Sequence, residues 1–146
     1  MKYLQVFEKF KESIIDKDDL VSKIRSEFSS DEDAKEEVDI YIDSLINLNK
    51  KGGKVYRLVW LKGKDRLKKN LGFHWVMDIG VFDRFYQGIK HEEDGYKPYL
   101  IIGKIEPGQI DIESSISQFT QLPQENEINL KFQPMKFKIK KWHEKL

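Results

Sequence analysis

The sequence contains no cysteine, which excludes disulfide bonds, thiolate metal sites and a cysteine nucleophile. Long apolar runs are also missing, since no stretch approaches the roughly 20 residues that a membrane-spanning helix needs. The first residues soon meet charged side chains and lack the apolar core of a secretory signal. We therefore expect a cytoplasmic chain that makes no membrane contact.

Histidine is scarce, with three in 146 residues, and their spacing forms no His-x-x-x-His pair, so the sequence predicts no metal site. The G-x-S-x-G, Walker and G-x-G-x-x-G motifs are absent too, so the sequence offers no nucleophile elbow, P-loop or Rossmann fingerprint. A chain of this length is usual for one domain, and no repeat, low-complexity stretch or linker divides it. We expect a single domain over residues 1–146, with a helical N-terminal subdomain over residues 1–52.

The net charge of +1 conceals an asymmetry along the chain. Residues 1–49 hold seven Lys and Arg against thirteen Asp and Glu, whereas the remainder carries a net charge of +7. The positive charge concentrates in the segment 62–69 and in Lys131, Lys136, Lys138, Lys140, Lys141 and Lys145. Such patches either attract phosphate, nucleic acid or an acidic partner, or they form a solvated face.

The first third of the chain has helical periodicity, with apolar residues recurring every three or four positions. The three apolar stripes span 4–14, 20–28 and 38–48. Asp18 or Asp19 can cap the second helix, and Ser29 and Ser30 stand three residues before acidic residues, as in a capping box. Gly52 and the glycine after it are expected to end the third helix.

The remainder of the chain is rich in β-branched and aromatic runs, which predict strands. We expect strands near 55–61, 72–77, 99–105, 110–112, 127–132 and 135–139, with short helical segments at 79–87 and 114–119. The first of these runs is apolar on both faces, which is typical of an inner strand. The last two alternate apolar with polar residues, as half-buried antiparallel strands do. The fold class is therefore α+β, with a helical N-terminal third packed on a mixed, mainly antiparallel β core.

Arg57 is the only charged residue in the apolar run 55–61 and shares a strand face with its apolar neighbours. A buried guanidinium is costly unless a partner compensates it. One interpretation is an ion pair with an internal carboxylate, or a position at a sheet edge. The other is a guanidinium held on a rigid strand to bind phosphate or a ribose hydroxyl.

Glu125 and Glu127 stand two residues apart, so on a strand both side chains would project from one face. Paired carboxylates can divide labour, one stabilising positive charge while the other handles a proton. The same alternation, continued by Asn129 and Lys131, also fits the wet face of an edge strand. His74 beside Trp75 is similarly ambiguous, because a lone histidine next to an aromatic is often packed or surface-exposed.

The order of these segments resembles the arginine–serine–glutamate pattern of the ADP-ribosyltransferases. The pattern runs from Tyr56-Arg57 through Gly72-Phe73-His74-Trp75-Val76-Met77-Asp78 and a helix with Phe82 and Phe85 to Pro123-Gln124-Glu125-Asn126-Glu127-Ile128. In that family a first-strand arginine holds the dinucleotide, a middle strand orders the site, and a late Glu-x-Glu or Gln-x-Glu strand carries the chemistry. The resemblance covers residues 54–132.

The resemblance implies an NAD-binding β core of the ADP-ribosyltransferase type over residues 53–146, with NAD as the substrate and no metal. It implies that Arg57 contacts the phosphate or ribose of NAD. Glu127 would be the catalytic carboxylate that stabilises the oxocarbenium-like cation as nicotinamide leaves. Glu125 would orient or deprotonate the acceptor. The side chains that could stack on nicotinamide are Trp75, Phe82, Phe85 and Tyr86.

One part of the chain departs from this pattern, because Trp75-Val76-Met77 stands where the family has a hydroxyl triplet. Either His74 supplies a polar contact to the ribose instead, or the chain is an inactive module of this fold that binds a protein or nucleotide. A third alternative is a nucleic-acid-binding domain that uses the lysine-rich segments. The acidic first third would repel nucleic acid, so a protein acceptor is favoured.

Overall fold

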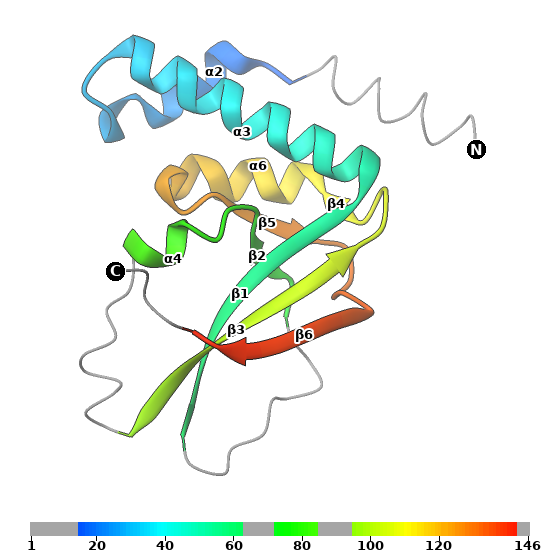
Figure 1. Cartoon of the computed structure of the whole chain (residues 1–146). Helices are drawn as coiled ribbons and strands as arrows, with labels where there is room; N and C mark the ends of the chain where they lie inside the picture. Colours follow the sequence, from blue (N-terminus) through cyan, green and yellow to red (C-terminus); the bar gives the residue numbers. More distant parts are fainter. Residues whose placement is uncertain (1–14, 63–71, 85–94, 143–146) are drawn as a thin grey trace.

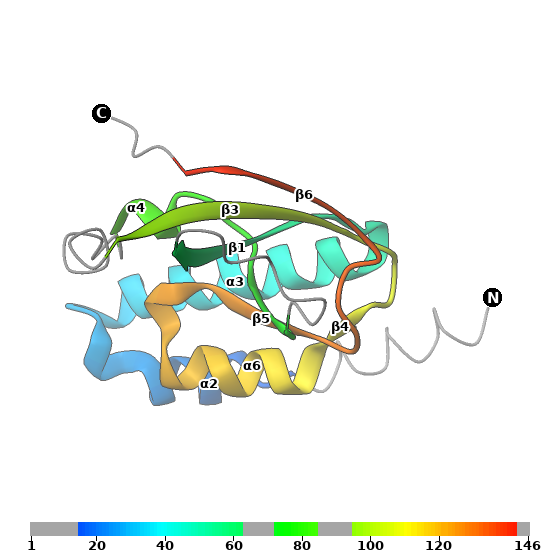
Figure 2. The same ribbon diagram turned by 90° about the horizontal axis from the view of Figure 1, so that it is seen from below.

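The computed structural model describes residues 15–62, 72–84 and 95–142 of the chain. Within these residues, three helices of eight residues or more lie on one side of a curved sheet (Figures 1 and 2). They are α2 (Lys17–Ile24), α3 (Asp31–Lys51) and α6 (Ile112–Gln121), and the shorter helical segments are η1 (Arg25–Glu27), α4 (Val81–Arg84) and η2 (Pro123–Glu125).

The sheet has six strands in the order β4-β5-β2-β1-β3-β6. Their bounds are β1 (Gly53–Lys62), β2 (His74–Val76), β3 (Tyr96–Ile105), β4 (Ile110–Asp111), β5 (Glu127–Leu130) and β6 (Lys136–Lys141). Every pair of neighbouring strands in this sheet is antiparallel. The predicted α+β class is confirmed, and the sheet that was expected to be mixed is antiparallel throughout the described part of the chain.

Helix α3 begins and ends where the sequence signals predict. The side chain of Ser30 accepts a hydrogen bond of 3.1 Å from the backbone N–H of Asp33, so Ser30 is the N-cap. Gly52 ends the helix with φ +71°, and a Cβ at this position would lie 2.5 Å from the carbonyl oxygen of Ile105. Glycine is therefore required here both by the backbone conformation and by the close approach of the chain that follows β3.

Helix α2 is capped by Asp16 and not by Asp18 or Asp19, so the predicted cap is wrong by two or three residues. Asp16 has an extended backbone, and its carboxylate accepts a hydrogen bond of 3.1 Å from the N–H of Asp19. Asp18 and Asp19 instead lie in the first turn, where negative charge interacts favourably with the helix dipole. All three residues are aspartates, which suit the N-cap position, and only the backbone conformation selects Asp16.

A single cluster of buried apolar side chains joins the helices to the sheet. It includes Val38, Tyr41, Ile42 and Leu45 from α3 and Val55, Trp75, Ile101 and Ile128 from the strands. Both Tyr41 and Ile42 are buried, although the helical stripe left them as alternatives. Burying one large apolar side chain contributes about 1.5–3 kcal/mol, so this cluster fixes the position of α3 over the inner strands.

The two C-terminal strands exist as predicted, but they do not pair with each other. β5 lies between β4 and β2, whereas β6 pairs with β3 at the opposite edge of the sheet (Figure 1). β6 is exposed along its whole length, and Phe137 and Ile139 are each 43% exposed, so the prediction of a half-buried strand is wrong for β6. Alternation reveals the period of a strand but not the neighbour that it pairs with.

Some predicted segments lie outside the described residues. These are the helix over 4–14, most of the basic segment 62–69, the end of the helix at 79–87, His91, His143 and Lys145. Within the part of the chain that the structure describes, no helix combines the length and the apolar character that crossing a membrane requires. The division of the chain into subdomains at residue 52 stays a prediction.

Candidate functional site

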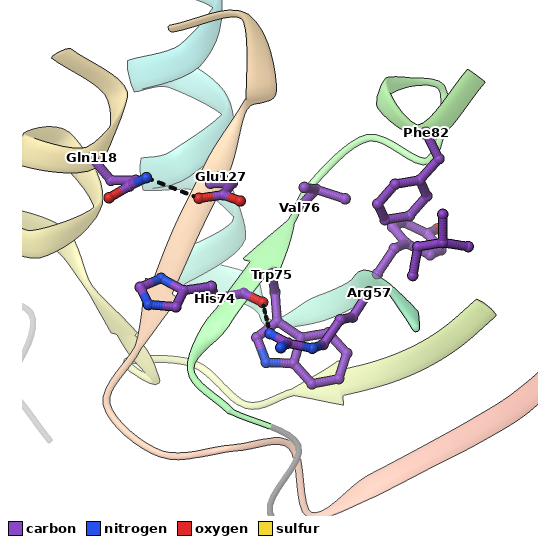
Figure 3. A pocket seen from close by; sticks show the side chains of 9 residues that line it. Arg57, His74, Trp75, Val76, Phe82, Gln118 and Glu127 are labelled. Atoms are coloured by element: carbon purple, nitrogen blue, oxygen red, sulfur yellow. Dashed lines mark hydrogen bonds between the residues drawn. The ribbon is translucent and has the colours of Figure 1, made fainter. Parts of the chain in front are cut away.

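A cavity of about 420 Å³ opens over the inner strands of the sheet (Figure 3). It is lined by Tyr56, Arg57, Leu58, His74, Trp75, Val76, Phe82, Gln118 and Glu127. Five elements contribute these residues: β1, β2, α4, α6 and β5. The structure therefore brings Arg57, His74 and Glu127 to one cavity, as the resemblance requires.

The strand register explains why Tyr56, Val76, His74 and Glu127 converge. Tyr56 of β1 lies opposite Val76 of β2, and Val76 lies opposite Glu127 of β5. Residues opposite each other in a sheet share a face, and so do residues two apart on one strand. His74 therefore projects from the same face as Glu127, and the two are diagonal neighbours on adjacent strands, about 7–8 Å apart by the usual geometry of such pairs.

Arg57 follows Tyr56 on β1, so it projects from the opposite face of the sheet to His74 and Glu127, beside Trp75, and it borders the cavity through its contact with β2 (Figure 3). Its Nη1 donates a hydrogen bond of 2.7 Å to the backbone carbonyl oxygen of His74, which uses one of the five N–H donors of the guanidinium (Figure 3). β1 lies between β2 and β3, so Arg57 is not at a sheet edge. Within the described residues, no carboxylate lies within ion-pair distance of Arg57.

The charge of Arg57 is shaped by two opposing effects. Partial burial lowers the pKa of Arg57, because desolvation disfavours the charged form, and the negative charge of Glu127 opposes this effect. The cation is thus compensated at longer range by Glu127 and by one carbonyl dipole. Such a guanidinium can still gain from an anionic ligand that enters the cavity.

Glu127 is the first residue of β5, and its carboxylate is oriented by α6. Its Oε2 accepts a hydrogen bond of 3.0 Å from Nε2 of Gln118 (Figure 3). The sequence had predicted only a helical turn over 114–119, whereas α6 is a ten-residue helix capped by the side chain of Asp111. Gln118 lies within the predicted segment, but no sequence motif indicated that it would be the partner of Glu127.

The backbone of Glu127 is held from the other side by Tyr41 of α3. The hydroxyl of Tyr41 lies 2.8 Å from the carbonyl oxygen of Glu127 and 2.9 Å from that of Ser115, so its one proton is shared between them. Burial and the charge of Glu127 raise the pKa of Tyr41, which keeps the phenol neutral. The ring of Tyr41 also stacks on Phe119 of α6, with centroids 4.0 Å apart. Tyr41 therefore links α3, α6 and β5 at the site.

We expect a Tyr41→Phe variant to lose about 1–3 kcal/mol of unfolding free energy, because two buried carbonyl groups lose their shared donor. Urea denaturation followed by circular dichroism measures this loss. Tyr99→Phe is the matched control, since no hydroxyl hydrogen bond of Tyr99 is found among the described residues. Equal stability of the Tyr41 variant and the wild type would contradict the proposed link.

Glu125 does not share a strand with Glu127, so this prediction is wrong. Glu125 ends the 3-10 helix η2, and Asn126 follows in the left-handed region with φ +50°. This kink precedes β5, so the alternation of a strand does not extend to Glu125. Among the described residues that line the cavity, Glu127 is present and Glu125 is not.

The two carboxylates nevertheless interact. Desolvation raises the pKa of Glu125, and the charge of Glu127 and a hydrogen bond with it act in the same direction. A carboxyl whose pKa is raised by folding contributes stability below its unfolded pKa, and this contribution is lost as the pH rises through the folded pKa. Glu125 is thus a weak destabilising charge at neutral pH.

We expect Glu125→Gln to be more stable than the wild type near neutral pH, by less than about 1 kcal/mol because the group is largely solvent-screened. The advantage should disappear below about pH 4, where the wild-type carboxyl is protonated in both states. Urea unfolding of both chains at the two pH values measures it. A difference that does not depend on pH would rule out the charge interaction as its cause.

The residues that were predicted to stack on nicotinamide differ in their position relative to the cavity. Trp75 is only 1% exposed, its ring belongs to the core, and its Nε1 donates a hydrogen bond of 3.1 Å to the carbonyl of Gly72. Strand alternation sends its ring to the face opposite His74, and although Trp75 is among the lining residues, its low exposure leaves little of the indole for nicotinamide to stack on. Phe82 lines the cavity and packs edge-on against Trp142, with centroids 5.8 Å apart. Phe85 and Tyr86 lie outside the described residues.

Asn129 is not part of a wet strand face, because it is 8% exposed and hydrogen-bonded on several sides. Its Oδ1 lies 2.5 Å from Nδ1 of His74, and its Nδ2 lies 2.5 Å from Oγ of Ser114. β5 is an inner strand along this stretch, with β2 on one side and β4 on the other. Its alternation with Glu127 placed Asn129 on the same face, but the sequence did not indicate its partners.

The described residues contain no group of three His, Asp or Glu side chains placed to hold a metal ion. Comparison of the chain with protein-family models, with curated proteins and with solved structures gives no match. The residues of the cavity and their geometry are therefore the features that indicate a function.

Proposed function

We propose that this chain binds NAD in the cavity and transfers its ADP-ribose group to an acceptor, which is a protein rather than a nucleic acid. The observation that carries the proposal is the convergence of Arg57, His74 and Glu127 on one cavity from three different strands. Neither periodicity nor charge requires residues so distant in sequence to meet. A shared binding role accounts for their meeting.

The positions of the three residues in the sheet support the proposed β core of the ADP-ribosyltransferase type. The pattern needs an arginine on the first strand, a middle strand that orders the site, and a glutamate on a late strand. Here these strands are β1, β2 and β5, and they are adjacent in the sheet. The size of the cavity, about 420 Å³, lies in the range of small-molecule sites of about 300–1,000 Å³.

The proposed roles follow from the charges of the ligand and of the cavity. NAD carries a diphosphate, for which the half-buried guanidinium of Arg57 is a suitable partner. Glu127, held at Oε2 by Gln118, lines the cavity where we place the nicotinamide ribose. As the bond to nicotinamide breaks, positive charge develops on the ribose, and a preorganised carboxylate stabilises it.

The missing hydroxyl triplet is partly compensated in this cavity. The side chain of Trp75 is almost fully buried, whereas His74 and Tyr56 also line the cavity, are more exposed and carry polar groups. These two residues can contact the ribose where the family uses serine and threonine. Phe82, which also lines the cavity, is assigned to the nicotinamide ring.

A transfer assay tests the proposal. The full chain is incubated with NAD labelled on its adenylate phosphate and with a cell lysate as the source of acceptors. We expect label in protein bands and free nicotinamide in equal amounts, together with saturable NAD binding in calorimetry. A chain that shows no NAD binding and no transfer would exclude the proposed function.

The second candidate function is NAD or nucleotide binding without turnover, which the absence of a hydroxyl triplet at 75–77 favours. It predicts calorimetric binding that depends on Arg57 but no release of nicotinamide in the same assay. The nucleic-acid alternative has the exposed lysines of β6 in its favour, and a steep salt dependence of binding would be its signature.

A further inference from the structure

A row of hydrogen bonds runs from α6 across β5 to the imidazole of His74 on β2. Oγ of Ser114 lies 2.5 Å from Nδ2 of Asn129, and Oδ1 of Asn129 lies 2.5 Å from Nδ1 of His74. The backbone of Asn129 is fixed as well, because Oγ of Ser115 accepts from its N–H at 2.8 Å and lies 3.2 Å from its carbonyl oxygen. Asn129 is nearly buried, so both its main chain and its amide are held in place.

This row specifies which ring nitrogen of His74 carries the proton. A side-chain amide has one acceptor, Oδ1, and one donor group, Nδ2. Because Nδ2 of Asn129 donates to Ser114, its Oδ1 is left to accept from Nδ1 of His74. With the amide in this orientation, the proton resides on Nδ1, and the lone pair of the neutral imidazole is on Nε2. The reverse orientation of the amide would place the proton on Nε2, so the orientation of the Asn129 amide determines the tautomer of His74.

The side chain of His74 belongs to the cavity side of the sheet. His74 is exposed, lines the cavity and shares its face with Glu127 (Figure 3). Its backbone carbonyl is held by Arg57, so both the main chain and the ring of His74 are fixed by neighbours. Glu125, by contrast, lies outside the cavity lining.

We propose that Nε2 of His74 is the general base that takes the proton of the acceptor, and that Asn129, backed by Ser114, is a positioning residue that fixes its tautomer. This inference rests on the proposed function and moves the proton-accepting role from Glu125 to His74. It also names the acceptor chemistry as a group with a removable proton, such as a guanidinium, amide or hydroxyl of a protein side chain.

The step balances in atoms and electrons. The lone pair of the acceptor nitrogen or oxygen forms a bond to C1′ of the nicotinamide ribose. The bond between C1′ and the ring nitrogen breaks, and its electron pair neutralises the nicotinamide. The proton of the acceptor passes to Nε2 of His74, which becomes an imidazolium and returns the proton to solvent. Glu127 stabilises the cationic ribose throughout and exchanges no proton.

The tautomer can be measured without any ligand, by ¹⁵N NMR of the full chain labelled in its three histidines. A His74→Gln variant assigns the resonances. We expect the Nδ1–H form for His74 in the wild type. Asn129→Leu should shift the ring toward the Nε2–H form, whereas Asn129→Asp, which still accepts from Nδ1, should keep the wild-type pattern. Ser114→Ala, a milder change, should produce a mixture, and it serves if Asn129→Leu fails to fold.

The kinetic counterpart is a separation of kcat from KM. We expect Asn129→Leu to lower kcat about 10- to 100-fold while KM for NAD changes less than about 3-fold, and Asn129→Asp to recover most of the rate. An Nε2–H wild type, or a wild-type kcat in Asn129→Leu, would overturn the inference and leave the proposed function intact. Absence of NAD turnover by a wild type with Nδ1–H histidine would instead overturn the proposed function, and the base role with it.

Discussion

A Glu127→Gln variant should release nicotinamide from NAD about 100- to 1,000-fold more slowly than the wild type, because it lacks the negative charge that stabilises the cationic ribose. The substitution is isosteric, and its side-chain oxygen can still accept the hydrogen bond that Gln118 donates. NAD affinity should change less than about 3-fold, because the interaction strengthens only as the charge develops. Single-turnover release of nicotinamide, followed by chromatography, measures the rate, and calorimetry measures the affinity.

The matched control is Glu106→Gln, the same substitution at an exposed residue that does not line the cavity. It should leave both the rate and the affinity unchanged. A Glu127→Gln variant that keeps the wild-type rate would remove the carboxylate from the mechanism. If the variant loses NAD affinity to the same extent as turnover, then Glu127 stabilises bound NAD and the transition state equally and does not act selectively on the transition state.

An Arg57→Met variant should bind NAD about 10- to 100-fold more weakly than the wild type. The reason is the loss of charge-assisted hydrogen bonds to the diphosphate, which are worth about 1.5–3 kcal/mol. Methionine keeps an apolar stem of similar length, so the packing between β1 and β2 is disturbed as little as possible. Calorimetric titration with NAD gives the affinity, and circular dichroism verifies that the variant is folded.

Two further variants separate charge from geometry. Arg57→Lys keeps the positive charge but not the planar fork, so we expect it to restore only part of the affinity. Arg25→Gln removes a guanidinium that pairs with Asp31 and does not line the cavity, and it should bind NAD as the wild type does. Wild-type affinity in Arg57→Met would show that NAD, if bound, does not use this cavity.

Local signals predicted the helices and inner strands well. Ser30 and Gly52 define α3 because a cap and a left-handed terminus depend on only a few neighbouring residues. The apolar run of β1 indicated an inner strand, and β1 lies between β2 and β3, although most of its side chains are only half-buried. Arg57 was a candidate because it is the only charged residue in this apolar run. Glu127 was a candidate because it completes the arginine–serine–glutamate pattern.

The errors share a physical cause. Glu125 was placed on a strand with Glu127, but the left-handed Asn126 ends that regularity. Trp75 was assigned to ligand stacking, although alternation on β2 turns it to the core while His74 faces the cavity. β6 was expected to be half-buried, but it pairs with the outer edge of β3. In each case the spacing of the residues was interpreted correctly. Spacing alone, however, does not reveal which other residues these side chains contact.

The amino-acid sequence by itself determined the α+β class, the ends of α3, the inner position of β1 and the two charged residues that were worth testing, since each follows from interactions among residues close in the chain. Only the tertiary structure decided that Arg57, His74 and Glu127 line one cavity, that Gln118 and Tyr41 hold Glu127, and that Asn129 holds His74. Those contacts join residues 9 to 86 positions apart. They depend on strand order and helix packing, which the burial of the whole core selects and no local pattern encodes.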